Sequence, residues 1–324
     1  MAGPAGLTEA DVDRHAEILA NRVKKNLRKL QKKFEQENIG VFRLYDWDIP
    51  EVRAAIDWYE GHLVVAEYAR DQTDKVPDWI GRMGRAVADT LGIAPGRIHL
   101  KTRRTQPKKG RRYDDKGRSR KRIEVRERDL KFLVNLDDYV DTGLFADHRE
   151  TRALVANEAK NKSFLNLFGY TGSFTCYAAL GGAKRTTTVD LSGPYLHWAK
   201  DNLQLNGLYS RKHELVKHDV LEWLDEAKAS PQRYDLAVVD PPSYSTRGGR
   251  GRNRFDIKRD HPDLLAATVG VMRKKGVVYF STNHQRFEPR FDYLKVSSIE
   301  EITKETIPAD YRNKKIHRAY RIVV

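Results

Sequence analysis

Four segments in the second half of the chain place glycine or aspartate just where an apolar, strand-like run ends. Gly169 and Gly172 follow the first run, Asp190 ends the second, and Asp219 and Asp240 follow the third and fourth. Open α/β sheets bind ligands at the carboxyl ends of parallel strands, which meet along one edge of the sheet. The order of these residues therefore predicts one ligand-binding edge made by four strands.

The residue types at this edge indicate a nucleoside ligand. Two glycines between a strand and a helix let a ligand approach the backbone closely. Asp190 follows the glycines by about 20 residues, the position at which an acidic side chain holds a ribose diol. Asp219 would accept a hydrogen bond from an exocyclic amine such as that of adenine. Either aspartate alone is equally well explained as a helix N-cap, but the ordered set favours the nucleoside site.

The fourth strand leads into Asp240-Pro-Pro-Ser-Tyr244. Two consecutive prolines form a rigid turn with a defined direction, although a plain loop has the same composition. Tyr244 would offer a stacking face for a base drawn away from its neighbours, or would pack inward as a core residue.

Strands and helices alternate around these residues. The hydrophobic pattern predicts strands at 163–168, 185–190, 213–217, 234–239, 276–281, 296–303 and 317–324, with clear helices at 194–206 and 259–274. This rhythm is typical of parallel βαβ units in a doubly wound sheet. We therefore expect residues 138–324 to form a Rossmann-like α/β domain.

The first part of the chain has a different texture. A capping-box pattern at Thr8 opens an amphipathic basic helix, so residues 1–40 are predicted to be a helical arm. Strand-like runs at 52–59, 62–69, 97–104, 122–128 and 130–136, with a helix at 77–91, predict a smaller α+β domain at 41–137. Residues 105–121 are basic and nearly devoid of apolar side chains, which predicts a projecting basic hairpin.

The charge points to a polyanionic partner. The chain of 324 residues has a net charge of +15, and residues 97–131 contain 16 Lys or Arg against 5 Asp or Glu. Clustered charge of this kind is typical of nucleic-acid binding, although a basic surface without a partner has the same composition. The single cysteine excludes an internal disulfide and a thiolate metal cluster. With no apolar span and no visible secretory signal, we expect a cytoplasmic protein that is not a membrane protein.

The ordered motifs resemble those of class I S-adenosylmethionine-dependent methyltransferases. More narrowly, the chain resembles bacterial 23S rRNA guanine-N7 methyltransferases of the RlmK type, which correspond to the C-terminal half of the fused RlmKL enzyme. The resemblance runs from about residue 11 to the C-terminus. It rests on Tyr45-Asp-Trp-Asp-Ile-Pro50, Gly143-Leu-Phe-Ala-Asp-His-Arg149, Asn166-Leu-Phe-Gly-Tyr-Thr-Gly172 and Phe255-Asp-Ile-Lys-Arg-Asp260.

The resemblance implies that S-adenosyl-L-methionine is the cofactor and that specific residues bind it. The implied cofactor-binding residues are Arg149, Asn166, Phe168, Gly169, Tyr170, Thr171, Gly172, Ser173, Asp190, Leu191, Ser192, Asp219, Val220 and Asp240. Among these, Arg149 would pair with the cofactor carboxylate or lie on the surface. The implied catalytic residues, which border the target base, are Asp240, Pro241, Pro242 and Tyr244.

The implied reaction is methylation of guanine N7 in 23S rRNA, either as naked RNA or within a pre-ribosomal particle. N7 has a free lone pair, so the protein needs to supply positioning rather than a general base. Cytosine-C5 methylation is disfavoured because it needs a cysteine nucleophile, and the only cysteine, Cys176, lies in a predicted helix. Guanine-N2 or adenine-N6 methylation of RNA, and a non-catalytic RNA-binding or ribosome-assembly factor, stay open as alternatives. Localised charge disfavours a small-molecule or protein substrate.

RNA contacts are expected from two basic segments. The predicted RNA-binding residues are Lys101, Arg103, Arg104, Lys108, Lys109, Arg111, Arg112, Arg247, Arg250 and Arg252, the last three in a Gly/Arg segment after the catalytic turn. That segment is also explained as an ordinary surface loop. No histidine spacing suggests a metal site, so no metal is expected.

Overall fold

The computed structural model describes residues 7–68, 73, 75–103, 121–139, 141–243 and 255–324. The chain divides into two compact units. One contains Met1–Ala146 and Ala309–Arg312, and the other contains Asp147–Pro308 and Asn313–Val324. The second unit carries the strand ends that the sequence singles out.

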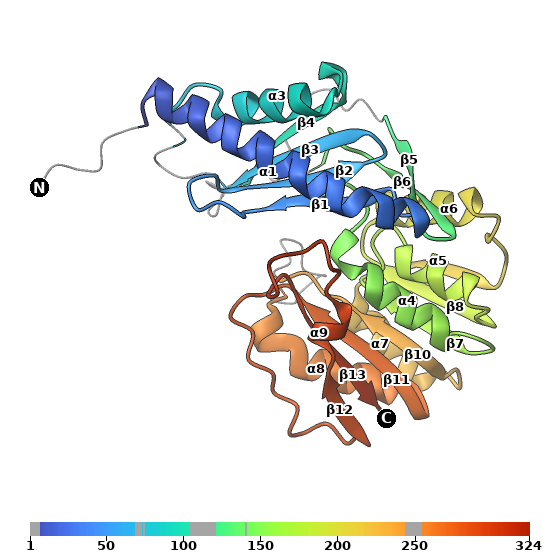
Figure 1. The fold of residues 1–324 in the computed structure, drawn as a ribbon. Coiled ribbons are helices and arrows are strands. Elements are labelled where there is room, and N and C mark those ends of the chain that lie inside the picture. Colours follow the sequence, from blue (N-terminus) through green and yellow to red (C-terminus); the bar gives the residue numbers. More distant parts are fainter. Residues whose placement is uncertain (1–6, 69–72, 74, 104–120, 140, 244–254) are drawn as a thin grey trace, which may run out of the picture. The chain divides into compact units, whose positions relative to one another are not determined.

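The first unit opens with the long helix α1 (Glu9–Gln36). Its predicted capping box at Thr8 is confirmed, because the Thr8 hydroxyl accepts from the Asp11 N–H while the Asp11 carboxylate accepts from the Thr8 N–H. The apolar face of α1, with Leu19 and Val23 fully buried, packs in one core with α3 (Trp79–Leu91), and the two helices lie side by side (Figure 1). Exposed lysines and arginines occupy the opposite face of α1.

A four-stranded sheet lies against these helices. It contains β1 (Val41–Asp46), β2 (Ala54–Tyr59), β3 (His62–Tyr68) and β4 (Ile98–Arg103), in that order. The β3–β4 pair is parallel, because α3 and the short helix η1 (Pro95–Arg97) make the crossover between them. A separate antiparallel hairpin is formed by β5 (Ile123–Glu127) and β6 (Leu130–Val134). The sequence predicts all of these strands except β1.

The second unit is built on a seven-stranded sheet. Its strands are β7 (Ser163–Leu167), β8 (Arg185–Asp190), β9 (His213–Lys217), β10 (Tyr234–Val239), β11 (Met272–Thr282), β12 (Ser298–Glu301) and β13 (Arg318–Val323). The order is β12-β13-β11-β10-β7-β8-β9. The five strands β11, β10, β7, β8 and β9 are parallel to one another, whereas β13 is antiparallel to both of its neighbours. The Rossmann-like α/β fold class is thus confirmed.

Helices cover both faces of this sheet (Figure 1). They are α4 (Arg149–Glu158), α5 (Ser173–Leu180), α6 (Gly193–Leu205), α7 (Val220–Ala229), α8 (Ile257–Gly270) and α9 (Thr303–Thr306), with the short helix η2 (Ala146–His148) before α4. In β10, Leu236 and Val238 share a core with α4 and α5, while Ala237 and Val239 share one with α7 and α8. Alternate side chains point to opposite faces, so the strand is apolar from Leu236 to Val239.

Most predicted element boundaries differ from the structure by one or two residues, and the largest difference lies between α8 and β11. The helix expected at 259–274 ends at Gly270, and β11 begins at Met272 rather than at residue 276. The segment Met272-Arg-Lys-Lys275 has helix-favouring residue types, but Tyr234 pairs with Met272 and the register then shifts. Tertiary pairing overrides the local preference here.

A buried ion cluster tightens the sheet of the first unit. Arg43, on β1, donates to Asp57 on β2 at 2.8 Å and to Asp46 at 2.9 Å, and its side chain is 7% exposed. The Arg43 N–H also donates to the Asp310 carboxylate at 2.8 Å, and its guanidinium lies over the Tyr311 ring. Arg43 therefore connects two strands to the distant segment Ala309–Arg312 of the same unit.

Replacing Arg43 by alanine should lower the free energy of unfolding by about 3–5 kcal/mol, because two carboxylates that are only 8% and 16% exposed would lose their cation. Arg82 is the matched control. It bonds Glu9 and Asp13, whose side chains are 78% and 75% exposed, so Arg82→Ala should change stability far less. Urea unfolding followed by circular dichroism measures both changes. Equal losses in the two variants would contradict this account of Arg43.

Candidate active site

The loop between β7 and α5 has an unusual backbone. Phe168, Tyr170 and Gly172 all adopt positive φ, at 57°, 49° and 74°. Such angles cost conformational energy in the two non-glycine residues and persist only where the surroundings impose them. The rings of both residues are packed: Phe168 lies 5.7 Å from Phe255, and Tyr170 lies 4.6 Å from Tyr195, between ring centroids.

The two glycines of this loop are required by close packing. A Cβ atom on Gly169 would lie 2.2 Å from Thr188 Cγ2 on β8, and one on Gly172 would lie 2.7 Å from Ala199 Cβ on α6. Real Cβ atoms do not approach that closely, so a side chain at either position would push the loop outward. The glycines hold the backbone tight against the neighbouring strand and helix.

Polar side chains support the loop from behind. The Asn166 amide donates to the Thr175 hydroxyl at 2.9 Å, and that hydroxyl lies 2.6 Å from the Thr188 hydroxyl. The Asn202 amide donates to the Thr171 carbonyl at 2.9 Å. Asn166, predicted to bind cofactor, is buried in this network. Ser173 is the first residue of α5. The loop is therefore fixed by the protein's own hydrogen bonds.

Asp190 joins the loop to the end of β8. Its Oδ2 accepts from the Tyr170 N–H at 2.9 Å, and its Oδ1 accepts from the Ser192 N–H at 2.8 Å. Burial raises the pKa of Asp190, while these two hydrogen bonds favour the charged form. Each carboxylate oxygen can accept more than one hydrogen bond, so both can also receive a ribose hydroxyl. Of its neighbours, Ser192 caps α6 and Leu191 is exposed.

Asp219 is a helix cap, as one interpretation of the sequence expects. Its Oδ1 accepts from the N–H groups of Leu221 and Glu222 at 3.0 and 3.2 Å, at the start of α7. Both bonds use one oxygen, so Oδ2 is the oxygen suited to accept from an adenine amine. Val220, the next predicted cofactor residue, is buried in the core beneath.

The turn that begins at Asp240, predicted to be catalytic, follows β10. Asp240 Oδ1 accepts a 2.6 Å hydrogen bond from the Ser281 hydroxyl at the end of β11, and Oδ2 lies 3.6 Å from His148 Nε2. Pro241 is buried and Pro242 is exposed, whereas Tyr244 lies outside the described residues. Sequence reasoning missed Ser281, and although the resemblance places the segment Asp147–Arg149 beside the cofactor, it did not predict the contact of His148 with Asp240. Ser281 could have been found, since the strand-end rule that selects Asp240 applies equally to β11.

Arg149 begins α4 and is 1% exposed, with its Nε 3.6 Å from a Glu150 oxygen. This burial excludes a surface position, which the sequence leaves open as the alternative to pairing with the cofactor carboxylate. That pairing stays a prediction.

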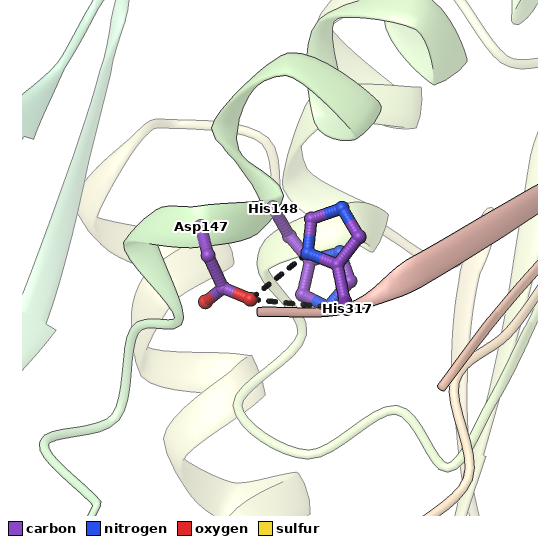
Figure 2. Close-up of side chains that lie close together, drawn as sticks. All are labelled: Asp147, His148 and His317. Atoms are coloured by element: carbon purple, nitrogen blue, oxygen red, sulfur yellow. Dashed lines mark hydrogen bonds and ion pairs between the residues drawn. The ribbon is translucent and has the colours of Figure 1, made fainter. Parts of the chain in front are cut away.

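Asp147, His148 and His317 form the one group of potential metal ligands found within the described residues, with their ligand atoms within 4.8 Å of one another (Figure 2). The two imidazole rings are stacked, 4.5 Å apart and inclined by only 11°. A ring nitrogen binds a metal in the plane of its ring, so one ion cannot lie in both planes as the rings stand. As the rings stand, the three side chains are joined by the contacts of both histidines to Asp147.

The predicted RNA-binding residues fall mainly outside the described part of the chain. Lys101 is buried on β4, and its ammonium donates to the Tyr139 carbonyl. Arg103 ends β4, and its side chain is not described. The others, outside the described residues, are Arg104, Lys108, Lys109, Arg111, Arg112, Arg247, Arg250 and Arg252.

Comparison with known families decides the class of protein. Residues 43–293 match the model of the S-adenosylmethionine-dependent methyltransferase family. The chain belongs to this family. It is an S-adenosylmethionine-dependent methyltransferase, and the tight glycine loop with Asp190 and Asp219 at adjoining strand ends fits the nucleoside and amino-acid parts of that cofactor.

Two curated relatives are similar over nearly the whole chain. Ribosomal RNA large subunit methyltransferase K of Neisseria meningitidis is 41% identical over 306 residues, which are 94% of this chain and 86% of the relative. Ribosomal RNA large subunit methyltransferase K/L of Shewanella loihica is 41% identical over 322 residues, 96% of this chain. The chain spans only 44% of the length of the K/L relative.

Solved structures support the fold. A methyltransferase crystallised with SAH has a TM-score of 0.76 and 21% identity, covering 95% of this chain and 82% of that one. A SAM-dependent methyltransferase from Streptococcus mutans has a TM-score of 0.75 and 20% identity, covering 95% of this chain and 81% of that one. In the part of the chain that the structure describes, no helix has the length and apolar character to cross a membrane.

Replacing Asp190 by alanine should weaken S-adenosylmethionine binding at least about tenfold, because a charged acceptor for the ribose would be lost. Asp225→Ala, which removes an exposed aspartate of α7, is the control and should leave the affinity unchanged. Isothermal titration calorimetry measures both dissociation constants. An unaltered constant for Asp190→Ala would refute the ribose assignment.

Proposed function

We propose that this chain methylates large-subunit ribosomal RNA, at N7 of a guanine in 23S rRNA. The observation that carries the proposal is the 41% identity to ribosomal RNA large subunit methyltransferase K, which extends over 86% of that relative. The similarity includes both units of this chain rather than the cofactor-binding unit alone.

The proposed chemistry needs little from the protein beyond position. When bound, S-adenosylmethionine supplies an activated methyl group. Guanine N7 attacks with a lone pair that carries no proton, so no general base has to act first. The base gains positive charge during transfer, and a fixed carboxylate at Asp240 would stabilise that charge. Ser281 holds one oxygen of this carboxylate in place.

The catalytic cysteine required for cytosine-C5 methylation is not available at this site. Cys176 is completely buried in α5, and burial raises the pKa of its thiol to about 12. A thiol with that pKa is not a thiolate near neutral pH and is a poor nucleophile. Its burial agrees with the role in the core that its position in the sequence favours.

The charge of the chain fits an RNA partner in a ribosome-containing compartment, the cytoplasm. Besides the predicted basic segments, helix α1 presents a row of exposed cations opposite its apolar face. They are Lys24, Lys25, Arg28, Lys29 and Lys32. Phosphates would be bound at these side chains with release of counterions, which makes affinity depend steeply on salt.

The function is tested by incubating purified protein with S-adenosylmethionine and 23S rRNA from a strain that lacks the enzyme, followed by mass mapping of the RNA. We expect one 7-methylguanine. Methylation at guanine N2 or adenine N6 would replace the N7 assignment by one of these alternatives. Cofactor binding without methyl transfer to rRNA or to precursor particles would favour a non-catalytic RNA-binding role.

Changing Lys24, Arg28 and Lys32 to glutamine should weaken RNA binding and flatten its salt dependence by about 0.7–0.9 in logarithmic slope for each lost phosphate contact. The control removes three exposed lysines of the second unit, Lys160, Lys212 and Lys304. Filter binding across a salt series gives both slopes. Equal flattening in the control would show that only net charge matters, and no flattening in the α1 variant would remove this face from the RNA interface.

A further inference from the structure

Helix η2 and the segment before β13 bring three ionisable side chains to the catalytic turn. His148 is buried, with its Nε2 3.6 Å from Asp240 Oδ2 and 3.8 Å from Asp147 Oδ2. His317 contacts the same oxygen, with its Nδ1 3.1 Å from Asp147 Oδ2, and its ring stacks on that of His148 (Figure 2). The cluster thus continues directly into the carboxylate proposed to face the target base.

His317 has a hydrogen-bond partner at each ring nitrogen, which fixes the orientation of its ring. Its Nδ1 bonds Asp147, and its Nε2 lies 3.0 Å from the Thr306 hydroxyl. The His148 ring stacks on the His317 ring and also lies 5.8 Å from the Phe174 ring of α5, between centroids. His148 therefore has little freedom to turn, and its Nε2 stays directed at the two carboxylates.

The surroundings determine which nitrogen of His148 carries the proton. Carboxylate oxygens only accept hydrogen bonds, so Nε2, which faces two of them, carries the hydrogen. Nδ1 is buried and has no hydrogen-bond partner within the described part of the chain. Burial lowers the pKa of His148, Asp240 and Asp147 oppose this shift, and His317 and Arg152 of α4 add to it. A neutral ring with its N–H toward Asp240 is the state these contacts favour.

We propose that His148 is a positioning residue for methyl transfer, which orients the Asp240 carboxylate through its Nε2–H while the Asp147–His317 pair fixes the imidazole. The Ser281 hydroxyl donates to Asp240 Oδ1 and His148 Nε2 faces Oδ2, so a contact at each oxygen fixes the orientation of the carboxylate. At 3.6 Å the second contact is longer than a hydrogen bond, as catalytic contacts often are before ligands bind. The inference rests on the proposed role of Asp240 at the target base.

A double-mutant cycle tests this role. His148→Ala should lower kcat for rRNA methylation about tenfold or more while leaving the KM for cofactor nearly unchanged, and His148→Gln should restore most of the rate because its amide N–H can replace Nε2–H. In an Asp240→Asn background, His148→Ala should cost little further, since the residue that it positions has already been changed.

His261 supplies the matched control. It is also fully buried in the second unit, but its ring is satisfied by the Ile257 carbonyl and the Arg290 N–H. His261→Gln should have the same effect with or without Asp240. Additive effects of His148→Ala and Asp240→Asn would overturn the proposal, as would bound zinc that is lost in His317→Gln, because the cluster would then be a metal site.

A second measurement is independent of the RNA substrate. In protein labelled with ¹⁵N-histidine, NMR should show His148 as the Nε2–H tautomer, and Asp240→Asn should lower the His148 pKa further because a charge that raises it is removed. An unchanged His148 signal in Asp240→Asn would overturn the positioning role. If Asp240→Asn lowers the His148 pKa but the wild-type protein methylates no rRNA, the proposed function alone would be contradicted.

Discussion

The geometry of the cofactor site depends on one carboxylate that accepts two backbone hydrogen bonds. Asp190 bonds the N–H of Tyr170 in the glycine loop and the N–H of Ser192 in the turn before α6. These two N–H groups belong to segments that follow different strands, so the Asp190 carboxylate fixes the two loops relative to each other. A neutral side chain of the same size would bond them less strongly, since hydrogen bonds to charged groups are about twice as strong. The acidic residue is therefore both a ligand candidate and a structural tie.

Two groups of polar side chains, largely buried, lie along the strand ends of the second unit. Behind the glycine loop lie hydroxyls and amides that bond one another, as Thr175 and Thr188 do. At the turn that follows β10 lie Asp240, Ser281 and the histidine cluster. Polar atoms are expensive to bury unless they are paired. The groups at this edge are paired in this way, which fixes the strand ends at which the cofactor is proposed to bind.

The sequence predicted where the strands of the second unit lie along the chain, because most of them are short apolar or β-branched runs bounded by turn residues. It also located Asp190, Asp219 and Asp240, since the ends of such runs are visible without a structure. It could not show that Phe168 and Tyr170 adopt positive φ, because neither residue type favours that conformation. Nor could it join His148 to His317, or assign the segment Ala309–Arg312 to the first unit, because these contacts link residues far apart in the chain.

The left-handed residues of the glycine loop have an energetic consequence for ligand capture. Their backbone cost is met when the chain folds, through ring packing on Phe255 and Tyr195 and through the tie to Asp190. A loop that is already shaped loses little conformational entropy on meeting its ligand, so most of the contact energy is available as affinity. Phe168→Gly or Tyr170→Gly would remove the backbone strain, but the loop would then lose its conformational entropy on binding the ligand rather than on folding.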